Sequence, residues 1–166
     1  AEFCNNWTEL AYQAQVIRAK LQHTNLKNLI ELNDVEQLPI GEYREQEMKI
    51  RVGQYFFRMA VLNSYNNRCC ITGICKSELL IASHIKPWRD CNQYTERTNP
   101  QNGLCLNPLH DKAFDKGLIT INSSYDIVVS NQLKDVEMDQ QTREGFWGYE
   151  GKQIILPDKF LPAKNF

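Results

Sequence analysis

The residues whose types and spacing suit chemistry lie in one part of the chain, the segment from Leu79 to Gly117. This segment contains two of the three histidines, His84 and His110, and three aspartates, of which Asp111 and Asp115 lie near its end. Imidazole serves as a general base near neutral pH, and carboxylates are ligands for divalent cations. The segment therefore carries the groups of a metal site together with a candidate base.

The first half of the segment predicts a strand that presents His84. Residues 79–88 are largely apolar and β-branched and end at a proline, which is typical of a strand. Because side chains alternate along a strand, His84 and Ser83 lie on opposite faces. A polar run over residues 89–101 then leads to a second short strand at residues 103–106.

The second half predicts a short helix with clear start and stop signals. Asn107 is the expected N-cap, and Pro108 suits the first helical position, where its missing N–H costs nothing. Gly117 is the matching C-terminal signal. Asp111 and Asp115 are one turn apart and share a face. A strand, a loop, a second strand and a helix with acidic residues form a scaffold of the size of a metal-binding finger.

Three short motifs in this segment carry a family resemblance. They are ASHIKPW, NPQNGLCL and LHDKAFDKGLI, which contain His84, Asn102, His110 and Asp111. They resemble the HNH endonucleases that have a ββα-metal finger, also called the His-Me finger. The resemblance extends upstream through residues 51–58 and 65–73, and its separate segments agree in order and spacing over roughly residues 49–130. It implies an α+β fold with a ββα-metal core, N-terminal helices and a following β-hairpin.

The resemblance also implies roles for individual residues. His84 matches the general base of the family, and Asn102 matches the residue that braces the loop and keeps this base aimed. The family spacing from Asn102 points to Asp111, nine residues later, as the helical metal ligand. Asp115 lies where related nucleases place a second ligand, and His110 competes with Asp111 as a ligand for softer ions. Carboxylate ligands favour one Mg²⁺ or Mn²⁺ ion.

Ser83 departs from the family pattern. Many nucleases of this type have a carboxylate or a histidine immediately before the base. A serine leaves one fewer charged ligand, so water and substrate oxygens would have to complete the coordination of the metal.

The charge distribution favours a nucleic-acid partner, with double-stranded DNA as the expected substrate. Net charge is −1, but residues 49–97 carry eight Lys/Arg against three Asp/Glu, whereas residues 1–48 carry four against eight. A local basic surface suits contact with phosphates. The expected contacts are Arg51, Arg58, Lys86, Arg89, Lys112 and Lys116. One alternative stays open for these cations, namely that they are ordinary solvated surface charges. A second question stays open for Trp88, which either stacks on a base or anchors the end of the strand.

The six cysteines allow three interpretations. None forms a C-x-x-C pair, and the spacing closest to a ligand pair is Cys70 with Cys75. Without a secretion signal, reduced thiols packed as small apolar side chains are the first interpretation. A structural Zn²⁺ on some of them is the second, and disulfides are the third.

Outside the finger, the sequence predicts two helices and a hairpin. Residues 7–21 and 43–63 each have an apolar stripe, and residues 118–122 and 127–130 flank a turn. The stripe over residues 7–21 fits either a core face or a dimerisation seam; its members are Trp7, Leu10, Ala14, Ile17 and Leu21.

We expect residues 1–45 to be a helical extension, a linker or a dimerisation region, and residues 46–166 to be the nuclease domain. A chain that starts at Ala1 is consistent with a piece of a longer protein, in which a recognition or sensor domain precedes the nuclease domain. No apolar run approaches the roughly 20 residues of a membrane span, and no signal peptide is visible. We therefore expect a cytoplasmic protein without a membrane partner.

These observations predict a metal-dependent DNA endonuclease that acts in restriction or anti-phage defence. Two alternatives stay open. One is a non-catalytic, zinc-stabilised nucleic-acid-binding module, and the other is an RNA-cleaving nuclease of the same family.

Overall fold

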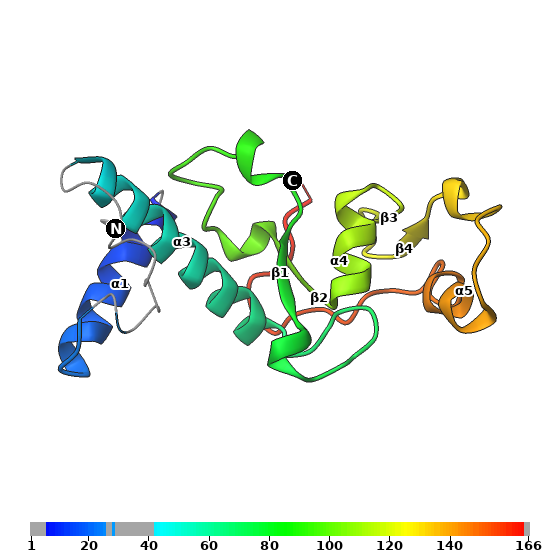
Figure 1. Cartoon of the computed structure of the whole chain (residues 1–166), viewed down its shortest axis with the longest axis horizontal. Helices are drawn as coiled ribbons and strands as arrows, with labels where there is room; N and C mark the ends of the chain where they lie inside the picture. Colours follow the sequence, from blue (N-terminus) through cyan, green and yellow to red (C-terminus); the bar gives the residue numbers. More distant parts are fainter. Residues whose placement is uncertain (1–5, 26–27, 29–41, 165–166) are drawn as a thin grey trace. The chain divides into compact units, whose positions relative to one another are not determined.

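Figure 1 shows the computed structural model of the chain, which describes residues 6–25, 28 and 42–164. The described residues contain α-helices, short 3-10 helices and two two-stranded sheets, in agreement with the predicted α+β class. The chain divides into two compact units. The first contains Ala1–Val61, His84–Gly103 and Phe166, and the second contains Leu62–Ser83 and Leu104–Asn165. The division passes through three elements: α3 (Glu42–Ser64), β1 (Ile81–His84) and β2 (Gly103–Leu106). The predicted domain boundary at residue 46 lies inside α3 and stays a prediction.

The first helix of unit 1, α1 (Trp7–Leu21), confirms the predicted helix at residues 7–21. Its start is fixed by Asn6, whose side chain accepts a hydrogen bond from the Glu9 N–H at 3.0 Å. The prediction of a core stripe is wrong at its C-terminal end, because Ile17 is 56% exposed and Leu21 is 76% exposed. The buried residues lie on the neighbouring row instead: Ala11, Gln15 and Ala19. Two small alanines on that row allow the helix backbone to pack closely against its surroundings.

The long helix α3 (Glu42–Ser64) confirms the predicted helix at residues 43–63. Val52, Phe57 and Val61 are buried on it in unit 1. The predicted helical continuation of residues 7–21 through Leu26, Leu29 and Ile30 lies outside the described residues.

Gly103 has no room for a side chain in unit 1. A Cβ at this position would overlap the Val61 side chain and would lie 3.1 Å from both Phe57 Cζ and the Pro100 carbonyl oxygen. We expect Gly103→Ala to lower the free energy of unfolding by about 1–3 kcal/mol, because an extra methyl group in a packed core forces its neighbours to shift. Urea denaturation followed by circular dichroism measures this change.

Gly145→Ala is the matched control for this substitution. Gly145 lies in a helix of unit 2, and a Cβ there would meet nothing within 4 Å. Since alanine is the better helix former, the control should be neutral or stabilising. Equal effects of the two substitutions would contradict the packing explanation.

Unit 2 carries most of the short elements. They are η2 (Ser77–Leu79), β1 (Ile81–His84), β2 (Gly103–Leu106), α4 (Pro108–Asp115), β3 (Ile119–Ile121), β4 (Ile127–Val129), η5 (Asn131–Leu133) and α5 (Gln140–Trp147), although His84 and Gly103 belong to unit 1. β1 and β2 form one sheet, and β3 and β4 form the predicted hairpin, in which Ile119 pairs with Val129 and Ile121 with Ile127. Figure 1 shows the order β1, β2, α4 along the chain.

The strand β1 is shorter than predicted. It covers Ile81–His84 rather than residues 79–88, because a 3-10 turn occupies Ser77–Leu79 and a second one, η3 (Trp88–Asp90), follows Pro87. The strand at Gly103–Leu106 is confirmed with its predicted bounds, and all four of its residues are buried.

The predicted start and end of the finger helix are both confirmed. The Asn107 side chain accepts from the His110 N–H at 2.9 Å, and Pro108 is the first residue of α4. Gly117 has φ +66°, and the Gly117 N–H and the next N–H donate to the Phe114 and Ala113 carbonyls. These are the two hydrogen bonds of a Schellman ending.

The core of unit 2 contains three free cysteine thiols. Cys69, Cys70 and Cys105 are buried, and the Cys70 N–H donates to the Cys105 carbonyl at 2.8 Å. The C-terminal segment packs onto the same region, since the Ile155 N–H donates to the Cys70 carbonyl. Among the described residues no helix is long and apolar enough to cross a membrane.

Candidate active site

His84 is held in unit 1 by one hydrogen bond and two aromatic contacts. Its Nε2 lies 2.8 Å from the Arg97 carbonyl oxygen. The imidazole stacks on Phe57, with ring centroids 3.8 Å apart, and meets Trp88 edge-on at 5.4 Å. Because a carbonyl oxygen can only accept, Nε2 carries the proton in the neutral ring and Nδ1 carries the lone pair.

The protonation state of His84 suits a general base. Burial lowers the pKa of the His84 imidazole below its usual value, against the smaller effect of the Arg97 carbonyl, which raises it. The neutral form therefore predominates at neutral pH. No described residue forms a hydrogen bond to Nδ1, so its lone pair is free to take a proton from a water molecule.

Asn102 is fully buried and ties together the two ends of the loop that follows His84. Its Oδ1 accepts from the Lys86 N–H at 2.8 Å, and its Nδ2 donates to the Lys86 carbonyl at 3.3 Å. Nδ2 also lies 3.2 Å from Cys91 Sγ and 3.4 Å from the Glu96 carbonyl. The Asn102 side chain touches only loop backbone and Cys91 in these contacts, so its geometry is that of a brace.

We expect Asn102→Ala to lower the free energy of unfolding by about 1–3 kcal/mol, because it removes the acceptor of the part-buried Lys86 N–H and the donor to the Lys86 carbonyl, which keeps only the Cys91 thiol. Asn102→Asp keeps an acceptor for the N–H but loses the donor and buries a charge, so it should also destabilise. Thermal unfolding by calorimetry measures both variants. A melting temperature unchanged in Asn102→Ala would contradict the bracing role.

Asp111 lies beside Ser83 and Asp115 within unit 2. Burial raises the pKa of the Asp111 carboxyl; the Ser83 hydroxyl lowers it in part, and the negative charge of Asp115 raises it further. Ser83 is itself only 3% exposed, and its Oγ makes no hydrogen bond of ordinary geometry to any described residue. Two carboxylates and an unsatisfied hydroxyl thus form a set of oxygen atoms with excess negative charge.

This set of oxygen atoms fits a hard divalent cation. Mg²⁺ and Mn²⁺ bind carboxylate oxygens and keep several water ligands, so they need few protein groups. A cation would neutralise the Asp111–Asp115 repulsion and give the buried Ser83 hydroxyl a partner. Within the described ranges, no three His, Cys, Asp or Glu residues gather as a metal-binding group.

His110 is held between protein oxygens. It is 2% exposed, its Nδ1 lies 3.1 Å from Asn107 Oδ1, and its Nε2 lies 2.8 Å from the Gly145 carbonyl. The ring also meets Phe146 and Tyr149 edge-on. Both ring nitrogens therefore lie beside acceptor oxygens, of which the neutral ring can donate to only one, and His110 connects α4 to α5. Sequence reasoning did not identify these contacts, since Gly145 has no side chain to signal them.

The predicted phosphate contacts differ in their surroundings. Lys86 forms an ion pair with Glu96 at 2.6 Å, and Arg51 forms one with Glu47 at 3.4 Å. Arg89 extends into solvent with 87% of its side chain exposed. Lys112 and Lys116 are exposed on or next to α4, and Arg58 is half-buried on α3. The exposed cations are the ones that can reach a phosphate without breaking a strong ion pair.

Arg97 is the main functional candidate that sequence reasoning missed. It supplies the carbonyl that orients His84, and its guanidinium lies over the Trp88 ring at 5.3 Å. It stands in a polar run without a recognisable motif, so no local pattern could have identified it.

The comparison with known protein families agrees with this geometry. The model of the family described as HNH endonuclease matches residues 69–122, a range that contains His84, Asn102 and both helical aspartates. No curated protein matches the chain. The match supports a nuclease that acts on nucleic acid. Residues 69–122, which carry the candidate site, are therefore similar to the HNH endonuclease family.

Proposed function

We propose that this protein is a metal-dependent endonuclease that hydrolyses phosphodiester bonds in double-stranded DNA. The observation that carries the proposal is the state of His84, whose Nε2 is held by a carbonyl while Nδ1 keeps a free lone pair. Burial keeps the ring neutral at the pH where a base is needed. The family match supports the same chemistry.

In this reaction His84 is the general base. A water molecule gives a proton to Nδ1 while its oxygen attacks the phosphorus, and the bond from phosphorus to the leaving oxygen breaks. The Arg97 carbonyl stabilises the imidazolium that forms, because the Nε2–H bond strengthens when the ring becomes positive. Asn102 acts as a positioning residue, since it fixes the loop that carries this carbonyl.

The metal site belongs to the finger formed by β1, β2 and α4. Asp111 is the proposed first ligand and Asp115 the second, with Ser83 as a neutral oxygen donor. When bound, Mg²⁺ or Mn²⁺ supplies positive charge to the phosphate as it gains a fifth bond. His110 is the weaker candidate, since both its nitrogens contact protein oxygens.

We place this activity in restriction or anti-phage defence, the setting that the family resemblance implies. A non-catalytic binding module is the second candidate, because Ser83 replaces a charged ligand and buried thiols are present in unit 2. Metal analysis of the purified protein separates the two. Stoichiometric, tightly bound zinc favours the module, whereas weak exchangeable Mg²⁺ or Mn²⁺ favours the enzyme.

Cleavage of supercoiled plasmid, methylated and unmethylated, tests the proposed function. Nicked or linear product should appear with Mg²⁺ or Mn²⁺ and disappear with a chelator. A structured RNA of similar length, assayed in parallel, distinguishes the DNA enzyme from an RNA-cleaving one. Absence of product from every substrate, with metal demonstrably bound, would favour the binding module.

A further inference from the structure

A pocket of about 380 Å³ lies within unit 1, close in the chain to His84. Its walls come from three segments: Thr8 of α1, residues 46–53 of α3 and the loop residues 88–98. The volume is within the range of small-molecule sites in proteins. Only Trp88 of its lining residues belongs to one of the three short motifs of the family resemblance, and Trp88 is also the only one whose side chain contacts the His84 ring in the described structure.

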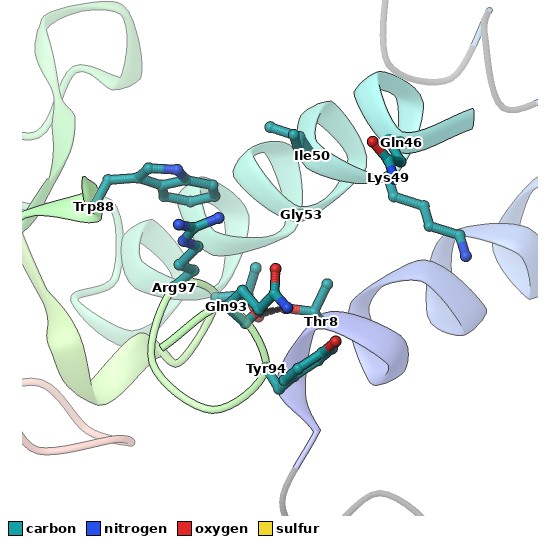
Figure 2. A pocket seen from close by; sticks show the side chains of 10 residues that line it. Thr8, Gln46, Lys49, Ile50, Gly53, Trp88, Gln93, Tyr94 and Arg97 are labelled. Carbon is teal, nitrogen blue, oxygen red and sulfur yellow. Dashed lines mark hydrogen bonds between the residues drawn. The ribbon is translucent and has the colours of Figure 1, made fainter. Parts of the chain in front are cut away.

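The side chains that line the pocket combine aromatic rings, cations and amides. Trp88 and Tyr94 supply the rings, and Tyr94 is 53% exposed and thus available for stacking. Lys49 and Arg97 supply positive charge, and no described lining residue is acidic. Figure 2 shows the Arg97 guanidinium beneath the Trp88 ring and the Tyr94 ring beside Thr8.

The Arg97 guanidinium has hydrogen-bond donors that an anionic ligand could satisfy. Its Nε is buried without a hydrogen-bond partner, and within the described residues its guanidinium has no carboxylate partner. A partly buried cation of this kind is stabilised by a negatively charged ligand that accepts hydrogen bonds, such as a phosphate.

The pocket is preorganised. The Thr8 hydroxyl donates to the Gln93 carbonyl at 2.6 Å, which fixes the loop against α1 and is drawn in Figure 2. Gly53 allows close approach on the other side, since a Cβ there would lie 2.9 Å from Thr98 Cγ2. Gln46 and Gln93 place amide groups, with both donors and acceptors, at the rim.

We propose that this pocket binds one unstacked nucleotide, with its base against Tyr94 or Trp88 and its phosphate at Arg97. Aromatic stacking, an amide edge and a guanidinium are the groups by which proteins hold single bases and their phosphates. The inference rests on the proposed function in one respect: the nucleotide is extrahelical in the DNA substrate. A free mononucleotide has the same chemistry and is the other source.

The proposal is tested by fluorescence anisotropy with two labelled DNA duplexes of equal length. One is fully paired, and the other contains a single unpaired thymidine. All measurements are made in chelator, so binding is read without cleavage. Since a stacked base adds about ten- to a hundredfold in affinity, the bulged duplex should bind at least about tenfold more tightly than the paired one.

Variants assign this preference to the pocket. Tyr94→Ala should remove it, and Trp88→Phe, which keeps an aromatic ring, should retain part of it. Phe160→Ala is the matched control, since Phe160 is an exposed aromatic residue of unit 2 and lies outside the pocket. Competition with thymidine monophosphate identifies the source. Tyr94-dependent binding of the monophosphate without any preference for the bulge assigns the pocket to a free nucleotide.

The proposal is overturned if neither the bulged duplex nor the monophosphate shows affinity that depends on Tyr94. That failure is distinct from failure of the nuclease, because plasmid cleavage with metal is measured separately.

Discussion

Replacing His84 by alanine is expected to slow plasmid nicking by about 10²–10⁴-fold, the usual contribution of a general base. The substitution removes the lone pair on Nδ1 that takes the proton from water, while metal binding by the α4 aspartates stays in place. Initial rates of conversion of supercoiled to nicked plasmid, with Mg²⁺ or Mn²⁺ and excess enzyme, measure the loss.

His84→Gln separates the loss of the base from the loss of the hydrogen bond to the Arg97 carbonyl. A glutamine amide can still donate to the Arg97 carbonyl but cannot act as a base at neutral pH, so its rate should fall as far as that of the alanine variant. His23→Ala is the matched control, because His23 is an exposed histidine of unit 1 and contributes to no site. Nicking that survives both His84 substitutions would assign the base to another group.

The pH dependence gives an independent readout of the same residue. Because burial lowers the pKa of His84, more than half of the imidazole is in the basic, neutral form at pH 6.5 and above. The logarithm of kcat/KM should rise with a slope of one below that pKa and stay level above it. If the rising limb lay above pH 6.5 instead, the imidazole would not be the group that titrates.

The parts of the fold that the sequence predicts best depend on local signals. The ends of α4 follow from Asn107, Pro108 and Gly117, which act within a few residues of the chain. The buried face of α1 could not be predicted in the same way, because Leu10 and Ile17 form a plausible stripe while Ala11 and Ala19 form the buried row. Which row is buried depends on the partner surface, and this is tertiary information.

In the candidate site, too, some residues could be predicted from local motifs and others only from the fold. The motifs identify His84, Asn102 and Asp111 by type and spacing, but the groups that set their chemistry are distant in the chain. Phe57 stacks on His84, and the Arg97 carbonyl, 13 residues from His84, determines which nitrogen is free. Of the nucleotide pocket the sequence signals only Trp88, because three separate segments contribute its walls.

Asp111→Asn is expected to weaken metal binding without lowering the stability of the metal-free protein. Burial and the nearby Asp115 raise the pKa of the Asp111 carboxyl, so stability falls as the pH rises from the unfolded pKa to the higher folded pKa, and the full cost is present above it. An amide removes this cost, and at neutral pH without metal the variant should melt at the same temperature as the wild type or slightly higher. Differential scanning calorimetry in chelator measures this difference.

Added metal should reverse the order of stability. A cation that binds the folded wild type at tenfold excess over its Kd contributes about 1.4 kcal/mol. For a chain of this size that is a rise in Tm of roughly 3–6 °C. The Asp111→Asn variant should show little or no rise with Mn²⁺, and its plasmid cleavage should fall by at least about a hundredfold. Asp115→Asn should lose part of both effects.

Asp135→Asn is the control, because Asp135 is an exposed aspartate away from α4. It should keep both the rise in Tm and the cleavage activity.

The metal-induced rise in the wild type should grow as the pH increases through the pKa of Asp111, since the cation binds the ionised carboxylate. A variant that loses cleavage but keeps the full rise in Tm would place the metal on other ligands, with His110 as the next to test. An unstable Asp111→Asn protein in chelator would instead make Asp111 a structural residue, because its ionised carboxylate would then stabilise the fold.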